Sequence, residues 1–213
     1  MLLELATLPW NLPMLARTPR GDGHPVLLFP GFMADESTLI VLKLFLQNRG
    51  YEVQTWGFGR NVGFQTRHAQ ALEQKIRWLH HKSGRRVNLV GWSRGGISCH
   101  MLANAMLKDS QLKNIPVNIF ALDPVPGIGN FQEERVKLGS NVKEYVAFYA
   151  RDERSKGFSC VIPQTATGTK TSVYPMAGRH ATLAGNATAD GGVPASASDL
   201  KTLVEPGRVV RHY

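Results

Sequence analysis

The sequence NLVGWSRGGISCHML, residues 88–102, places a serine between two glycines where one hydropathy pattern gives way to another. A short apolar run leads up to Gly91. Beyond Ser93 the apolar residues recur every three or four positions, as on one face of a helix. The stretch therefore predicts a strand, a sharp turn and a helix. Such a turn is strained and brings backbone segments close together, so both Gly91 and Gly95 are expected to sit where a Cβ would clash.

The chain on both sides of this turn alternates strand and helix patterns. Strands are expected over residues 24–32, 51–59, 85–93, 115–123, 141–150 and 172–176, with helices over 35–50, 66–84 and after Ser93. Polar, glycine-rich loops are expected over 165–172 and 185–199. The alternation predicts an α/β fold with a mainly parallel sheet flanked by helices. No repeat or linker is evident, so we expect a single domain, residues 1–213.

The chain carries 25 Lys and Arg residues against 16 Asp and Glu, a net charge of +9 that favours anionic partners. The basic residues are dispersed, which argues against nucleic acid and leaves an anionic membrane surface as the expected macromolecular contact. The opening segment has an early Glu4 and two prolines and lacks a basic start. We therefore expect no signal peptide, and a protein that is cytoplasmic or exported without one.

Metal and cofactor motifs are not evident in the sequence. Cys99 and Cys160 are the only cysteines, too few for a zinc site or a disulfide framework, and we expect two buried free thiols rather than a bridge. No phosphate-binding loop, dinucleotide fingerprint or metal-ligand spacing occurs, so neither a cofactor nor a metal is expected.

The residues Gly91 to Gly95 satisfy the G-x-S-x-G pattern of a nucleophile presented between a strand and a helix. A serine hydroxyl needs a base to accept its proton. His180 is the candidate, because it follows the last expected strand and ligands of open α/β sheets bind outside the carboxyl ends of the strands. His100 lies seven residues along the helix from Ser93, about 10 Å away, and cannot reach. The other histidines precede strands, lie on helices or, like His212, are nearly terminal.

Two aspartates are candidates for the carboxylate that orients the imidazole, and each ends an expected strand. Asp123 closes NIFALD, and Asp152 follows YVAFYAR. Both give the chain order Ser, Asp, His. Asp152 is preferred, because it is nearer His180 in sequence and follows the later strand; Asp123 is the alternative.

An oxyanion hole requires two donors near the nucleophile. We expect the backbone N–H of Arg94, which follows the serine, and that of Phe32 in the loop after the first strand, where Gly31 permits a tight turn. Apolar side chains expected at the strand ends could contact an acyl chain. They are Phe32, Met33, Trp56, Phe58, Trp92 and Met176.

These motifs resemble the α/β-hydrolase superfamily. The first half, PVLLFPGF to VNLVGWSRGG, is similar to bacterial serine esterases and lipases, and the second half, with ALDPVPG, YARDERSKGF and GRHATL, is similar to lipases of the secreted-effector type. The resemblance implies an α/β-hydrolase fold with little or no lid domain. Only residues 124–141 are expected to be able to cover the site, as a small flap.

The resemblance also implies a function: hydrolysis of a small ester or lipid through a Ser93 acyl-enzyme. Two alternatives remain open at the sequence level. One is acyl transfer to an acceptor other than water, and the other is a hydrolase-shaped binding protein without turnover.

Overall fold

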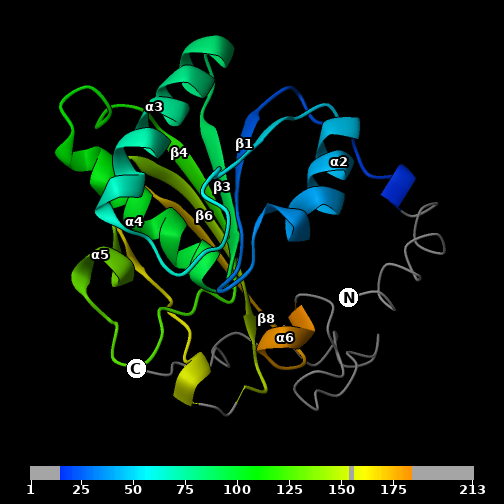
Figure 1. Ribbon diagram of the computed structural model, residues 1–213, viewed down its shortest axis with the longest axis vertical. Helices are drawn as coiled ribbons and strands as arrows, with labels where there is room; N and C mark the ends of the chain where they lie inside the picture. Colours follow the sequence, from blue (N-terminus) through cyan, green and yellow to red (C-terminus); the bar gives the residue numbers. More distant parts are fainter. Residues whose placement is uncertain (1–14, 154–155, 184–213) are drawn as a thin grey trace.

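A parallel sheet of six strands forms the centre of the structure, a computed structural model that describes residues 15–153 and 156–183 (Figure 1). The strand order is β2-β1-β3-β4-β6-β8, and every neighbouring pair is parallel. The chain thus starts near the middle, crosses to one edge and returns to build the other half. The carboxyl ends of all six strands consequently lie at one end of the molecule.

The elements follow the expected order. The sheet consists of β1 (Pro25–Phe29), β2 (Glu52–Thr55), β3 (Val87–Trp92), β4 (Val117–Leu122), β6 (Val142–Ala150) and β8 (Lys170–Met176). A short 3-10 turn (Glu36–Leu39) leads into α2 (Ile40–Asn48), and the longer helices are α3 (Thr66–Ser83) and α4 (Arg94–Lys108). Short elements complete the fold: α5 (Glu133–Val136), β5 (Lys137–Leu138), the 3-10 turn Lys156–Phe158, β7 (Gln164–Thr165) and α6 (His180–Leu183). The loop expected over 165–172 is shorter, because β8 already begins at Lys170.

The two faces of β1 enter different hydrophobic clusters. Leu27 and Phe29 pack with the buried side chains of α3 and α4, whereas Val26 and Leu28 pack on the opposite face with Leu46 of α2. This alternation follows from the two-residue period of a strand. Helices therefore lie on both faces of the sheet, as expected, with α3 and α4 on one side and α2 on the other.

The segment between β4 and β6, which was expected to act as a flap, is attached to the side of α4. His100 Nδ1 lies 2.8 Å from the carbonyl oxygen of Arg135, and the Asn104 amide donates to the carbonyls of Glu134 and Lys137 at 2.9 and 2.7 Å. Those bonds hold α5 beside the helix that follows the serine. The part of this segment that α5 occupies is therefore fixed against α4. The expectation that it acts as a flap over the site is wrong for this part.

Some expectations fall on parts of the chain outside the described residues: the opening segment 1–14, the loop over 185–199 and His212. In the described ranges, no helix is long and apolar enough to cross a bilayer. Cys99 and Cys160 are both buried and unbridged, as expected.

Candidate active site

The turn at Ser93 has the strained geometry that the sequence indicates. Ser93 has φ 55° and ψ −124°, is 3% exposed, and immediately precedes α4 at the carboxyl end of β3. A Cβ on Gly91 would lie 2.3 Å from the carbonyl carbon of Gly95, and one on Gly95 would lie 2.6 Å from the carbonyl oxygens of Phe29 and Pro30. Gly91 therefore lets the start of α4 pack against β3, and Gly95 lets it pack against the end of β1, which fixes Ser93 between β3 and α4.

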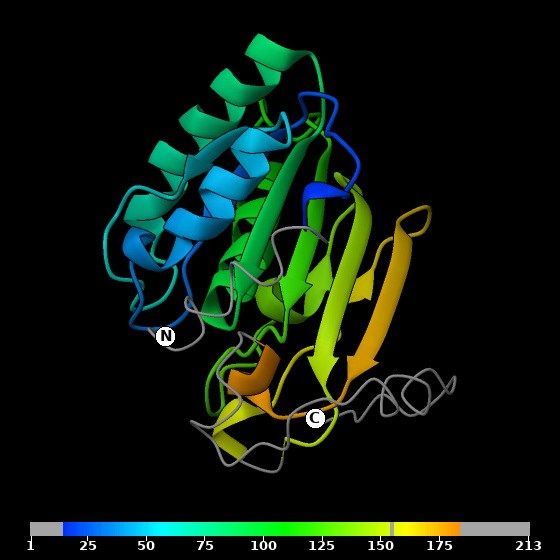
Figure 2. The same ribbon diagram turned by 90° about the vertical axis from the view of Figure 1, so that its right-hand side faces the viewer.

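His180 reaches this end of the sheet at the start of α6. Its Nδ1 lies 2.6 Å from Oδ2 of Asp123, and both side chains are buried, 5% and 1% exposed. Figure 2 shows why the pair can form: α6 lies at the end of the molecule toward which the strand arrowheads point. Residues 57 positions apart in sequence are thus brought together by the return of the chain after β8.

Three donors surround the Asp123 carboxylate. Oδ2 faces His180, and Oδ1 accepts a hydrogen bond from the Ala150 N–H at 3.0 Å. The Cys160 thiol is the third: burial, together with the negative charge of Asp123 and a hydrogen bond to it, raises the pKa of this thiol well above its ordinary value. Cys160 therefore stays protonated and acts as a donor, and the buried carboxylate is kept in a fixed orientation.

Two aromatic rings stack on the imidazole of His180. Trp92 stacks on it with ring centroids 5.1 Å apart and an interplanar angle of 22°, and Phe158 stacks at 4.8 Å and 26°. The backbone N–H of His180 donates to Glu153 Oε2 at 3.1 Å. With Nδ1 bound to Asp123, His180 is held by ring stacking, by its backbone N–H and by one ring nitrogen. The other nitrogen, Nε2, is the one left to exchange a proton with a hydroxyl.

Asp152, the preferred carboxylate from sequence, occupies a different place. Its Oδ2 accepts from the Gly178 N–H at 2.8 Å, its Oδ1 faces Arg151 Nε at 3.1 Å, and its side chain is 45% exposed. Asp152 therefore ties the loop after β6 to the loop after β8. The structure brings Asp123 to the imidazole instead, because β4 is the direct neighbour of β3 and Asp123 turns at its end with φ 41°.

The loop that carries Phe32 is fastened by Asn61, whose side chain is fully buried. Asn61 Nδ2 donates to the Pro30 carbonyl at 2.7 Å, and its backbone carbonyl accepts from the Met33 N–H at 2.8 Å. Phe32 lies between these two bonds. Arg94 is the first residue of α4, so its N–H belongs to the helical turn whose amides lack an intrahelical partner. Arg94 therefore belongs to the Ser93 turn itself, and Phe32 lies in the loop whose start, at Pro30, packs against Gly95.

The Trp92 ring also explains why residue 31, in the loop that carries Phe32, is a glycine. A Cβ at Gly31 would lie 2.4 Å from Cε3 of the Trp92 ring. The ring that stacks on His180 therefore fills the space that a side chain at position 31 would need, and the loop and the imidazole share one packing partner.

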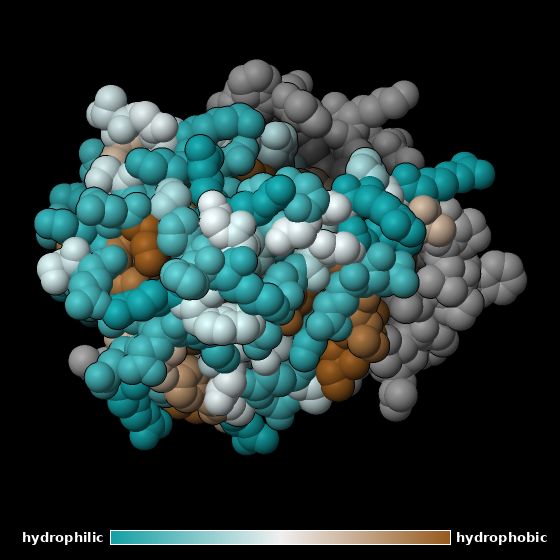
Figure 3. All heavy atoms as spheres, turned by 90° about the horizontal axis from the view of Figure 1, so that it is seen from above, coloured by the Kyte–Doolittle hydropathy of each residue, from teal (hydrophilic) through white to brown (hydrophobic). Residues whose placement is uncertain are grey.

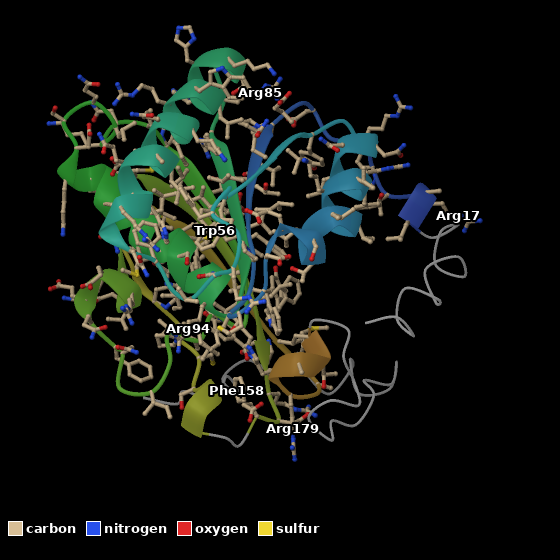
Figure 4. All side chains as sticks on the ribbon, in the orientation of Figure 1. Arg17, Trp56, Arg85, Arg94, Phe158 and Arg179 are labelled. Carbon is tan, nitrogen blue, oxygen red and sulfur yellow. The ribbon has the colours of Figure 1, made fainter. Side chains whose placement is uncertain are left out.

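Some of the expected acyl-contacting side chains are exposed or half-buried, whereas others are packed in the core. Met33 is 51% exposed, with φ 60°, and Met176 is half-buried at the end of β8. Trp56 is 1% exposed, packs in the main core and donates from Nε1 to the Gly59 carbonyl at 2.9 Å, and Figure 4 places it near the centre of the molecule. The expectation for Trp56 is corrected: its ring is core. Phe58 is partly exposed and stacks on His68 at 4.6 Å.

Four residues of this site were missed from sequence: Asn61, Glu153, Phe158 and Cys160. Each acts through a long-range contact that no local pattern records. The one available signal was the run RDERSKGF before Cys160, which was considered only for Asp152.

No family model and no curated protein matches the chain on sequence, but solved structures match its fold. Lipase B of Aspergillus fumigatus matches with a TM-score of 0.50 and 12% identity over 72% of this chain and 45% of the lipase. The lin2722 gene product of Listeria innocua matches at 0.50 and 13% over 85% of this chain and 92% of its own. The Tle1 effector, solved bound to the VgrG spike of the type 6 secretion system, matches at 0.45 and 11%, over 78% and 51%.

The two matches with a TM-score of 0.50, together with the parallel sheet and the strand–turn–helix at Ser93, define the fold. The chain has the α/β-hydrolase fold, which it shares with the Aspergillus lipase. The resemblance found in the sequence is thus confirmed at the level of fold. The chain spans less than half the length of the Aspergillus lipase.

Proposed function

We propose that the protein hydrolyses carboxylic esters through a Ser93–His180–Asp123 triad. The observation that carries the proposal is the 2.6 Å contact between His180 Nδ1 and the buried Asp123 carboxylate, at the strand ends where Ser93 is held in a strained turn. A histidine and an aspartate buried together at the strand ends that carry such a serine support the proposal, because the members of a triad are assigned by their positions and roles.

In the proposed mechanism, His180 Nε2 takes the proton from the Ser93 hydroxyl as its oxygen attacks the ester carbonyl. Asp123 holds Nδ1–H and thereby fixes the tautomer whose Nε2 can accept that proton. The protonated His180 then gives the proton to the leaving alcohol, which departs and leaves an acyl-enzyme. Water, deprotonated by the same nitrogen, attacks the acyl-enzyme and releases the carboxylic acid and free Ser93.

The Arg94 and Phe32 backbone N–H groups are proposed to bind the oxyanion of each tetrahedral intermediate. Arg94 contributes from the first turn of α4, where the helix dipole also favours negative charge. Phe32 contributes from the loop that Asn61 fastens. Each such donor is worth about 3 kcal/mol of transition-state stabilisation in comparable enzymes.

The test is reaction with a fluorophosphonate, followed by intact mass, alongside turnover of p-nitrophenyl butyrate. The parent should gain one adduct and hydrolyse the ester, while Ser93→Ala should do neither yet remain folded by circular dichroism. No adduct on a folded parent would contradict the proposal and favour a binding protein without turnover. An adduct with no hydrolysis, but with ester product formed when a short alcohol is added, would indicate acyl transfer.

An anionic lipid surface is the partner proposed for the apolar face beside the site. None of the residues of α2 is buried, and exposed apolar side chains continue into the loop that carries Phe32: Phe32, Met33, Ile40, Val41, Leu42 and Leu44. By contrast, Figure 3, which views the end remote from His180, shows mainly hydrophilic side chains with apolar atoms in separate patches. The net charge of +9 favours an anionic rather than a neutral bilayer.

Vesicle flotation tests this contact. Phosphatidylglycerol vesicles should retain the protein at low salt and release it at high salt, whereas phosphatidylcholine vesicles should bind less. Leu44→Asp should weaken the binding, and Ile115→Val, a change in a buried residue, is the control. Equal binding by Leu44→Asp and the parent would contradict the proposed surface.

A further inference from the structure

A cavity of about 140 Å³ lies beside the Ser93 turn and contains two arginines. It is formed by the loop between β2 and α3, the first half of α4 and the segment that includes α5. Polar side chains in its wall are Gln65, Arg94, Asn130 and Arg135. Figure 4 places Arg94 at the same end of the molecule as Phe158, which stacks on His180. The cavity therefore lies at the end of the molecule that carries the proposed catalytic residues, and Arg94 in its wall directly follows Ser93.

The Arg94 guanidinium is held in place by apolar and backbone surfaces rather than by an acid. Its Cζ lies 3.9 Å from the centroid of the Phe32 ring. A Cβ on Gly127, whose φ is 90°, would lie 2.5 Å from Nη2, so the guanidinium packs directly against the backbone there. Within residues 15–153 and 156–183, no carboxylate forms an ion pair with Arg94.

Arg135 brings a second positive charge to the same space. Its Nε is buried and has no hydrogen-bond partner among the described residues, and no acid there pairs with it. Burial, together with the charge of Arg135, lowers the pKa of Arg94 below its ordinary value. Two guanidinium groups that repel each other in a partly desolvated cavity are stabilised by an anion between them.

The geometry points to a subsite in which Arg94 and Arg135 bind a phosphate group carried by the ester substrate. This inference rests on the proposed function. Arg94 is the residue after Ser93, so a phosphate on its side chain would belong to the molecule whose carbonyl lies at the serine. The forked donors of arginine suit the oxygens of a phosphate, and a cavity of about 140 Å³ has room for such a group but not for an acyl chain as well.

A matched pair of substrates tests the subsite: 1,2-dibutyrylglycerol and 1,2-dibutyrylglycerol 3-phosphate, which differ only in the phosphate. The parent should show the higher kcat/KM on the phosphate ester. The specificity ratio is kcat/KM on the phosphate ester divided by kcat/KM on the neutral ester. Arg135→Gln should lower this ratio by about tenfold or more, since a hydrogen bond to a charged group is lost. Arg135→Lys should lower it less. Arg77→Gln, which removes one charge from the exposed side of α3, should leave the ratio unchanged.

Calorimetric titration of inorganic phosphate into Ser93→Ala provides a readout that needs no catalysis. Phosphate should bind, and binding should be lost when Arg135→Gln is added to Ser93→Ala. A parent that hydrolyses both esters with equal kcat/KM, and a ratio unmoved by Arg135→Gln, would overturn the subsite while leaving ester hydrolysis intact. Phosphate binding without any effect on the ratio would show a site for the free anion and would equally overturn it. No turnover of either ester would remove the proposed function and the substrate role together, and the titration would then report only whether the two arginines hold phosphate.

Discussion

Replacing Asp123 by asparagine should disable the active site without removing the side chain. Oδ1 of Asp123 faces the Ala150 N–H at 3.0 Å, and only an oxygen can accept there. The amide of an asparagine is therefore forced to turn its NH2 group toward His180 Nδ1, 2.6 Å away in the parent. That nitrogen must then become the acceptor, which places the imidazole proton on Nε2, the atom that should take the proton of Ser93.

The expected size of the effect follows from this reversed tautomer. Reversal of the histidine in a serine triad lowers kcat by about 10⁴-fold, and we expect Asp123→Asn to lose about that factor in p-nitrophenyl butyrate turnover. Asp152→Asn keeps an oxygen for the Gly178 N–H and loses the partly exposed ion pair with Arg151. A pair of that kind is worth about 0–1 kcal/mol, so turnover should stay within about fivefold of the parent.

The assay compares initial rates and fluorophosphonate labelling rates for the parent, Asp123→Asn and Asp152→Asn. Circular dichroism and urea unfolding confirm that each variant is folded. The reasoning is refuted if Asp152→Asn is the slow variant, or if Asp123→Asn labels and turns over like the parent.

Three further outcomes are expected. Asn61→Ala should lower kcat by about tenfold or more with little change in KM, because it leaves the Pro30 carbonyl without its donor; an unchanged kcat would show that the loop does not depend on Asn61. Burial lowers the pKa of His100 to about 4, so as the pH falls the imidazole is protonated in the unfolded chain before it is protonated in the folded chain. The free energy of unfolding should therefore fall by up to about 3 kcal/mol as the pH drops from 7 to 4, measured against His100→Gln in urea, and parallel pH curves would refute this. Burial and the raised pKa of the Cys160 thiol should protect it from iodoacetamide at pH 8 until urea unfolds the protein; rapid modification of the native protein would contradict this.

Much of the fold could be predicted because its signals are local. The strand–turn–helix at Ser93 needs glycines on both sides, and the alternation of apolar runs with helical periodicity predicts a parallel sheet. His180 could be located as well, because a loop after a late strand returns to the same edge of the sheet.

The choice between Asp123 and Asp152 could not be made in this way. Nearness along the chain favoured Asp152, but the sheet order decides which strand end lies beside β3, and β4 does. Trp56 failed as a site residue for a related reason. The local sequence around an aromatic residue that follows a strand is the same whether its side chain faces a pocket or the core. Only the packing in the folded structure distinguishes the two cases.

The two rings that stack on His180 have an energetic consequence. During the proposed reaction the imidazole becomes a cation, and Trp92 and Phe158, which both stack on it, present their π electrons to it. Aromatic faces stabilise a nearby cation by about 0.5–2 kcal/mol, more as water is excluded. The charged intermediate therefore gains a stabilisation that the neutral resting histidine does not. Because Trp92 precedes the nucleophile and Phe158 follows β6, this gain exists only after both halves of the sheet have assembled around the ring.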